Sequence, residues 1–344
     1  MKLSFSTLAC PEWELKKIIE KSKKFGYDGI EIRGILKELD LAKVPELNEE
    51  AENTKKLLSS NNIEISCISA SSTFTNPDPS EREKNIQMAV SHIDIAKRFN
   101  IVVLEDAAHA FGAEYNGKKI GTIGHFGAFS FHEVKNITSL GEGGILVTNE
   151  EIGKDFPKAR FVGFDISNPI PLWLYDVVAL KWKGDYFAPG NHSVTEIQAV
   201  ALLSQMKRLN KIIEKRRKAA EYLNEKFKDI KGIVIPPLDD NKIKSTHHLY
   251  LFQVESSLLK GDIQDVKKKM AEKGITQIPH FAPLYRFSIM KQLGYDTEKI
   301  KQTCPNAEEV FLHRFTHLPL YDFKKQDLKY MADSIIEIIK GMQK

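Results

Sequence analysis

The chain has 344 residues, of which 42% are hydrophobic and 9% aromatic, so two or three domains with ordinary buried cores are expected. Fifty basic and 46 acidic residues leave a net charge of +4 spread along the chain, which argues against a nucleic-acid partner or an anionic-membrane partner, and no apolar run is long enough to span a bilayer. Three widely separated cysteines without CxxC spacing argue against a metal site or a disulfide framework and favour a reducing, cytoplasmic compartment.

The first hundred residues alternate between strand-like and helix-like patterns. Strands are predicted at residues 3–8, 29–33 and 63–69, and helices at 13–25, 51–58 and 81–99. In the first helix the apolar residues Leu15, Ile18 and Ile19 share one face, which predicts its buried side. This alternation predicts three βα units whose parallel strands are joined by right-handed crossovers.

The middle of the chain predicts a further sheet. The apolar residues 101–104 predict a fully buried strand, with Glu105 and Asp106 at its carboxyl end, where open α/β sheets bind their ligands. Strands are also predicted at residues 128–131 and 144–148. From Ser193 the pattern becomes helical with capping-box spacing to Glu196, and it continues to about residue 227 as one long helix or two broken ones.

The C-terminal part of the chain predicts a small α+β module. Two prolines at 236–237 mark a boundary, before a strand at 248–254, a helix at 263–273 and a strand at 276–280. A terminal helix is predicted to bury a stripe made of Leu328, Met331, Ile335, Ile339 and Met342. The basic run from residue 207 to 218 is interpreted as the solvated face of a helix rather than as a phosphate-binding patch.

Asp106 and Lys135 are the candidate chemical groups. A lysine can react with the aldehyde of pyridoxal phosphate (PLP) and later move a proton at the substrate carbon, and a carboxylate facing the pyridine nitrogen keeps that ring able to accept electrons. Asp106 stands at a predicted strand end, and Lys135 follows a strand in a polar loop. The pair alone leaves two alternatives open, a surface lysine and an acid that caps a helix or turn.

The surrounding motifs resemble the DegT/StrS family of sugar aminotransferases, over about 245 residues and in the right order. These motifs are EDAAHAFGA (105–113), GKKIG (117–121), FSFH (129–132), KN (135–136), GEGG (141–144), NHSVTEIQA (191–199), HFAPL (280–284), CPNAE (304–308) and LPL (318–320). The resemblance implies a PLP enzyme with the type I aminotransferase fold and a homodimer as its assembly.

Carried over by position, the resemblance makes Lys135 the Schiff-base lysine and Asp106 the partner of the pyridine nitrogen. It places His109 near the cofactor ring, Ser130 at the cofactor phosphate and Asn191 at the phosphate of the neighbouring subunit. His280 matches a position near the active site and is expected to contact substrate. A core histidine, a strand hydroxyl and a strand-end histidine are the alternatives for His109, Ser130 and His280. Ser193 stands where the family commonly has arginine, so substrate or phosphate contacts from that loop are left open.

The first hundred residues resemble a different family. MKLSFSTLA (1–9) and FGYDGIEIR (25–33) are similar to the start of a xylose-isomerase-like TIM barrel of the sugar phosphate isomerase/epimerase type. The metal-binding acids and histidine of that family come from later strands, so no metal site is transferred. Glu31 and Arg33 are interpreted as a salt-bridged pair at a strand end rather than as part of a sugar site. The two resemblances meet near IAKRFN (95–100), so the chain is expected to be chimeric.

The expected architecture is α/β with three parts. Residues 1–99 would form a partial TIM barrel, 100–230 part of the large PLP-binding domain, and 231–344 the small α+β domain. The expected function is transfer of an amino group from glutamate or glutamine to the keto group of a nucleotide sugar, as in polysaccharide biosynthesis. Activity is expected to be impaired, because the helix N-terminus that anchors the cofactor phosphate in the family has no match in residues 1–99. An isomerase or epimerase activity of the N-terminal units and a catalytically inactive fusion are the alternatives.

Overall fold

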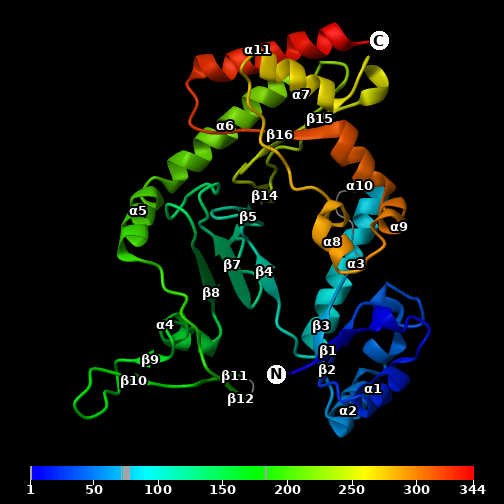
Figure 1. The fold of residues 1–344 in the computed structure, drawn as a ribbon, viewed down its shortest axis with the longest axis vertical. Coiled ribbons are helices and arrows are strands. Elements are labelled where there is room, and N and C mark those ends of the chain that lie inside the picture. Colours follow the sequence, from blue (N-terminus) through cyan, green and yellow to red (C-terminus); the bar gives the residue numbers. More distant parts are fainter. Residues whose placement is uncertain (1, 71, 73–77, 183) are drawn as a thin grey trace. The chain divides into compact units, whose positions relative to one another are not determined.

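The structure is a computed structural model that describes residues 2–70, 72, 78–182 and 184–344 (Figure 1). The chain forms two compact units. One contains the residues up to 104 together with 124–126, and the other contains 105–123 and 127–344. Each unit is described by itself, and the predicted domain boundaries at residues 99 and 230 stay predictions.

The N-terminal unit contains a parallel sheet of three strands in the order β1-β2-β3. Its strands are β1 (Ser4–Ser6), β2 (Gly29–Ile32) and β3 (Glu64–Ile68). Its α-helices are α1 (Leu15–Lys24), α2 (Ala51–Asn61) and α3 (Pro79–Arg98), drawn in blue and cyan in Figure 1. The predicted alternation and the parallel pairing are therefore confirmed, and the likeness to a TIM barrel stays a prediction.

The core of this unit forms where helix α1 meets the sheet. Leu15, Ile18 and Ile19 of α1 are at most 1% exposed, as their spacing predicts, and Ile30 and Ile32 of β2 are fully buried. Apolar side chains three and four positions apart lie on one face of a helix, so this face is removed from water as a unit.

Glu31 of β2 has hydroxyl groups as its main partners. Ser69 Oγ donates a hydrogen bond to Glu31 Oε1, and the pKa of Glu31 lies below its usual value chiefly because of this bond, then because of one from Ser6. Burial acts in the opposite direction, and the charge of Arg33 contributes least. No ion pair joins Glu31 and Arg33 within the described residues, so the predicted salt bridge is wrong, and serine hydroxyls satisfy the carboxylate instead.

The sheet that carries Asp106 has three strands in the order β4-β7-β8. Its strands are β4 (Leu104–Asp106), β7 (Phe126–Ser130) and β8 (Gly144–Thr148). The strand predicted over residues 101–104 begins only at Leu104, whose side chain is 60% exposed. The prediction of a fully buried strand at residues 101–104 is therefore wrong. A parallel strand is buried only between neighbours and under cover on both faces, and β4 lies at the edge of its sheet.

The C-terminal module of the second unit is built on an antiparallel sheet in the order β13-β15-β16. Its elements are β13 (Ile233–Val234), β15 (Tyr250–Val254), β16 (Phe315–Leu318), α6 (Leu209–Phe227), α7 (Ile263–Glu272) and α11 (Lys325–Met342). Helix α11 contacts α6 and α7 (Figure 1). Four members of the predicted α11 stripe are at most 5% exposed and Leu328 packs beside them, so the stripe is confirmed.

Three predictions for the second unit need correction. Residues 276–280 form no strand, and only Ile278 makes a single bridge, to His317. The capping box is formed by Thr195 and Gln198 rather than by Ser193 and Glu196, whereas the long helical pattern is two helices, α5 (Glu196–Met206) and α6, which is one of the two predicted alternatives. In the basic run, Arg216 is partly buried and donates to the carbonyl of His248, so the run is not wholly solvated.

The remaining elements of the second unit are short. Antiparallel pairing gives the sheet β14-β5-β6 and the hairpins β9-β10 and β11-β12. These strands are β5 (Glu114–Tyr115), β6 (Lys118–Lys119), β9 (Phe164–Asp165), β10 (Asp176–Val177), β11 (Leu180–Trp182), β12 (Asp185–Phe187) and β14 (Ile243–Lys244). The short helices are α4 (Phe156–Arg160), α8 (Ser288–Gln292), α9 (Thr297–Gln302) and α10 (Pro305–Glu309). Among the described helices, none has the length and apolarity needed to cross a bilayer.

Candidate active site

The end of strand β4 positions two carboxylates in different ways. Glu105 accepts hydrogen bonds from the backbone N–H groups of Gly121 (2.7 Å) and Ile123 (2.6 Å), so its carboxylate holds the loop after β6. The Asp106 carboxylate is exposed and accepts one bond from the backbone N–H of Ala108 (3.1 Å). This bond is the turn cap that the sequence left open as an alternative, and it occupies only one carboxylate oxygen.

The loop that carries Lys135 follows strand β7 and is fixed by hydrogen bonds. Ser139 is 1% exposed, and its hydroxyl lies 3.1 Å from the carbonyl of Phe131 and 2.9 Å from that of Glu142. Gln205 of α5 donates to the carbonyl of Thr138 and accepts from its N–H (2.6 and 3.1 Å). Helix α5 therefore braces the loop through a side chain that the sequence analysis did not single out.

A glycine is required beside this loop. An added Cβ at Gly143 would lie 2.3 Å from Ser139 Oγ, a distance that the bracing hydroxyl cannot accommodate without moving. The GEGG motif therefore provides the space in which Ser139 makes its two contacts.

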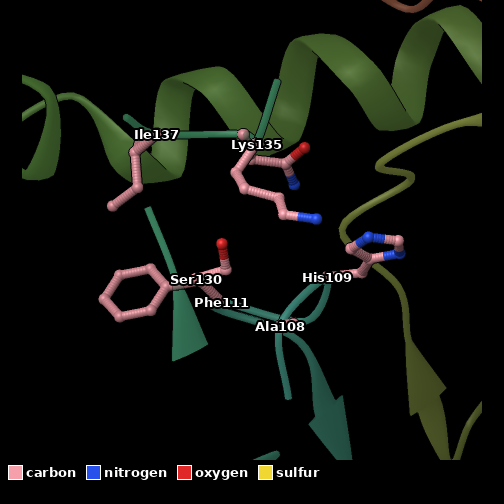
Figure 2. Close-up of a pocket in the computed structure, with 7 residues that line it drawn as sticks. Ala108, His109, Phe111, Ser130, Lys135 and Ile137 are labelled. Carbon is pink, nitrogen blue, oxygen red and sulfur yellow. The ribbon is translucent and has the colours of Figure 1, made fainter. Parts of the chain in front are cut away.

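These segments surround a small hollow in the second unit. It is lined by Ala108, His109, Phe111, Ser130, Lys135, Asn136 and Ile137. Figure 2 shows the Lys135 amine extending toward the His109 ring and the Ser130 hydroxyl directed into the same space. Three of the predicted site residues, His109, Ser130 and Lys135, therefore line one hollow.

The electrostatics of the hollow connect Asp106 to two of these residues. Partial burial holds the pKa of the Lys135 amine below its ordinary value, and the negative charge of Asp106 opposes this shift. The pKa of His109 is lowered by burial first and by the charge of Lys135 second, again against Asp106. Lys135, His109 and Asp106 thus act on one another, and the lowered pKa gives the lysine a larger neutral, nucleophilic fraction near neutral pH.

Three predicted site residues do not line this hollow: Asp106, which acts on Lys135 and His109 through its charge, Asn191 and His280. Asn191 is exposed, and its side-chain oxygen accepts from the N–H of Ser193 (3.0 Å). His280 is exposed beside Phe315 and His317, with ring centroids 5.1 and 4.8 Å away. The predicted contacts of Asn191 with a partner subunit and of His280 with substrate stay predictions.

Two residues of the site region were missed by the sequence analysis. His248 lies against the His109 ring, with centroids 4.4 Å apart, and its Nδ1 is 2.9 Å from Asn136 Oδ1. The KN motif contained Asn136, but nothing in the sequence pairs it with a histidine 112 positions away. Only the folded chain brings them together.

Comparison with known proteins identifies the class of the molecule. The profile of the DegT/DnrJ/EryC1/StrS aminotransferase family matches residues 87–336, and that of the xylose isomerase-like TIM barrel matches residues 19–122. The first match covers more than half of the chain, and the chain therefore belongs to the DegT/DnrJ/EryC1/StrS aminotransferase family. Members of this family depend on PLP, and solved relatives of the fold include PLP-bound and PMP-bound forms.

Individual relatives are similar over most of this chain. An uncharacterized protein of Methanocaldococcus jannaschii is 33% identical, and UDP-4-amino-4,6-dideoxy-N-acetyl-beta-L-altrosamine transaminase of Campylobacter jejuni is 26% identical. Both matches cover 73% of this chain and 62% of the relative, so the chain spans less than two thirds of these curated relatives. Helicobacter pylori PseC, an aminotransferase involved in the biosynthesis of pseudoaminic acid, has a similar fold, with a TM-score of 0.61 at 20% identity over 96% of this chain and 86% of that one.

Proposed function

We propose that the chain is a PLP-dependent aminotransferase that moves an amino group from glutamate or glutamine to the keto group of a nucleotide-linked sugar. The observation that carries this proposal is the hollow in which the Lys135 amine faces His109 and Ser130 while the charge of Asp106 acts on Lys135 and His109. Family membership supports the reaction class, and the names of the nucleotide-sugar transaminases among the relatives support the substrate class.

The side chains around the hollow fit the chemistry of PLP. The bound cofactor supplies an aldehyde and an electron-accepting ring. Lys135 would provide the amine that holds the aldehyde carbon and would then carry a proton to or from the substrate carbon. Asp106, with one oxygen outside its turn cap, would face the pyridine nitrogen and keep it protonated.

Two further residues would bind and orient the cofactor. Ser130, whose hydroxyl accepts from the N–H of His132 (3.2 Å), retains a hydroxyl proton that it can donate to a phosphate oxygen. The His109 imidazole would lie against the ring. His280 would contact substrate, and Asn191 would reach the cofactor phosphate of a second subunit in a homodimer.

We infer weak cofactor binding. Within the hollow, Ser130 is the hydroxyl available to a phosphate group, whereas strong phosphate sites combine several donors with a helix N-terminus. We therefore expect a measurable but low affinity for PLP and slow turnover. The chimeric origin that the two family resemblances suggest is consistent with this expectation.

The test is the absorption spectrum of the purified protein with added PLP. A visible band from covalently bound cofactor is expected in the wild type and in the matched surface variant Lys118→Ala, and its loss is expected in Lys135→Ala. Lys118 lies in the short exposed strand β6 and serves as the control for removing one lysine. A wild type that stays colourless at saturating PLP would reject the proposed chemistry.

A further inference from the structure

The segment from Ser245 to His248 joins β14 to β15 and contacts both sides of the hollow. Thr246 Oγ1 donates to the carbonyl of His109 (3.1 Å), and Asn136 Nδ2 donates to the carbonyl of Thr246 (3.4 Å). His248 is hydrogen-bonded to Asn136 through Nδ1 and lies against the His109 ring at an interplanar angle of 38°. One segment therefore holds the neighbour of Lys135 and the backbone and ring of His109.

The conformation of this segment is fixed from outside the hollow. His247 has a φ of 42°, a left-handed conformation that a non-glycine residue keeps only where its surroundings hold it. Asp239 provides this hold, because one of its oxygens lies 3.1 Å from His247 Nε2 and accepts from the N–H of Ser245 (2.8 Å). Arg216 also donates to the carbonyl of His248 (3.0 Å).

The imidazole of His248 is neutral near neutral pH. The pKa of His248 is lowered to about 3, chiefly by burial and then by the charges of His109, Arg216, Lys135 and His317. Asn136 uses its Nδ2 as a donor to Thr246, so its Oδ1 faces His248 and can only accept. The proton of the neutral ring therefore lies on Nδ1, and His248 is the donor of this hydrogen bond.

We propose that His248 is a positioning residue: by donating to Asn136 and packing on the His109 ring, it holds Lys135 and His109 so that both face one hollow. The proposal rests on the proposed function, in which these two residues meet the cofactor. His248 itself touches neither cofactor nor substrate in this account. It acts through the residue next to Lys135, and removing its hydrogen bond should let the lysine loop turn toward solvent.

The test measures the reactivity of the Lys135 amine in the full chain without added cofactor. The pH dependence of reductive methylation is followed at Lys135 by peptide mass spectrometry, with exposed Lys291 of α8 as the internal reference. His248→Leu keeps the approximate volume but removes the donor, whereas His248→Asn keeps an N–H near the position of Nδ1. Thermal melts check that each variant is folded, and Asn136→Ala removes the acceptor if His248→Leu does not fold.

In His248→Leu and Asn136→Ala the pH midpoint of Lys135 labelling is expected to rise relative to that of Lys291, because exposure removes the burial that lowers the pKa of the amine. His248→Asn should label like the wild type. Wild-type labelling in His248→Leu would overturn the proposal, and so would a His248→Asn that behaves like His248→Leu. The PLP absorption band of the wild type is recorded in a separate experiment. If that band is missing but the variants show the expected labelling differences, the proposed function is rejected and the positioning role of His248 remains supported.

Discussion

Strands β15 and β8 are both five residues long and rich in apolar side chains, but only β15 buries one whole face. Tyr250, Phe252 and Val254 of β15 are at most 1% exposed, whereas Ile145 and Leu146 of β8 are 46% and 44% exposed. Strand β15 lies between β13 and β16 in the core shared with α6, α7 and α11, and β8 lies at the edge of its sheet. The difference shows that what packs on an apolar strand decides its burial, more than its own composition does.

The same contrast separates the two ways in which the second unit is stabilised. The C-terminal module depends on apolar burial around Phe227 and Phe252, whose ring centroids are 5.7 Å apart. The Lys135 loop depends on hydrogen bonds made by Ser139 and Gln205. A stable apolar module therefore lies next to a polar site region whose geometry is set by individual hydrogen bonds.

Removal of a core side chain should give the largest effect. Phe252→Ala is expected to lower the free energy of unfolding by about 3–5 kcal/mol, because the side chain is fully buried and leaves a cavity. Leu251→Ala on the same strand, where the side chain is 43% exposed, should change it by less than about 1 kcal/mol. Urea unfolding of the two variants measures this difference, and equal losses would show that the two faces of β15 are equally buried in solution.

His317 is a buried polar residue that is expected to lower the free energy of unfolding. It is 5% exposed, and neither ring nitrogen has a hydrogen-bond partner within the described residues. His317→Phe should therefore raise the free energy of unfolding at pH 7 by about 1–3 kcal/mol, since an unpaired buried polar group is replaced by an apolar ring. A loss of stability measured by urea unfolding would show that these nitrogens are satisfied in solution.

The same variant should change the response to acid. Burial, followed by His280 and His109, lowers the pKa of His317 from 6.5 to about 4, so between these values the unfolded chain binds a proton that the folded chain does not. The free energy of unfolding therefore falls as the pH falls from 6.5 to about 4, by up to about 1.4 kcal/mol per pH unit. A shallower loss in His317→Phe than in the wild type is the expected result.

The exposed edge strand should give the smallest effect. Ile145→Ser is expected to change the free energy of unfolding by no more than about 0.5 kcal/mol, because the side chain is 46% exposed. Urea unfolding alongside Phe252→Ala provides the measurement. A loss as large as 2 kcal/mol, on the scale of about 2–5 kcal/mol typical of buried aliphatic residues, would mean that β8 is covered in solution.

Periodic patterns in the sequence predicted the elements that bury a regular face. The stripes of α1 and α11 follow from helical spacing alone, and the buried positions Ile18 and Ile335 are where that spacing puts them. Residues 101–104 were apolar enough for a buried strand, but their burial depends on partners far away in sequence. The strand predicted at 276–280 also depends on a distant partner, and only Ile278 forms a bridge, to His317.

Only those residues of the candidate site that belong to recognised motifs could be predicted from the sequence. The motif positions gave His109, Ser130 and Lys135, which line one hollow, and Asp106, whose charge acts on two of them. His248 could not be found this way, because its role comes from a fold that brings it next to Asn136. Side chains that brace a site through single hydrogen bonds have no periodic pattern in the sequence.

Lys135 is proposed as the residue that holds PLP. Borohydride reduction of the protein incubated with PLP, followed by peptide mapping, tests this role most directly, because reduction fixes the cofactor on the lysine that carried it. The mass of reduced cofactor is expected on the peptide containing Lys135 and is expected to be absent from Lys135→Ala. Modification spread over surface lysines, with the peptide of Lys135 unmodified, would contradict this role.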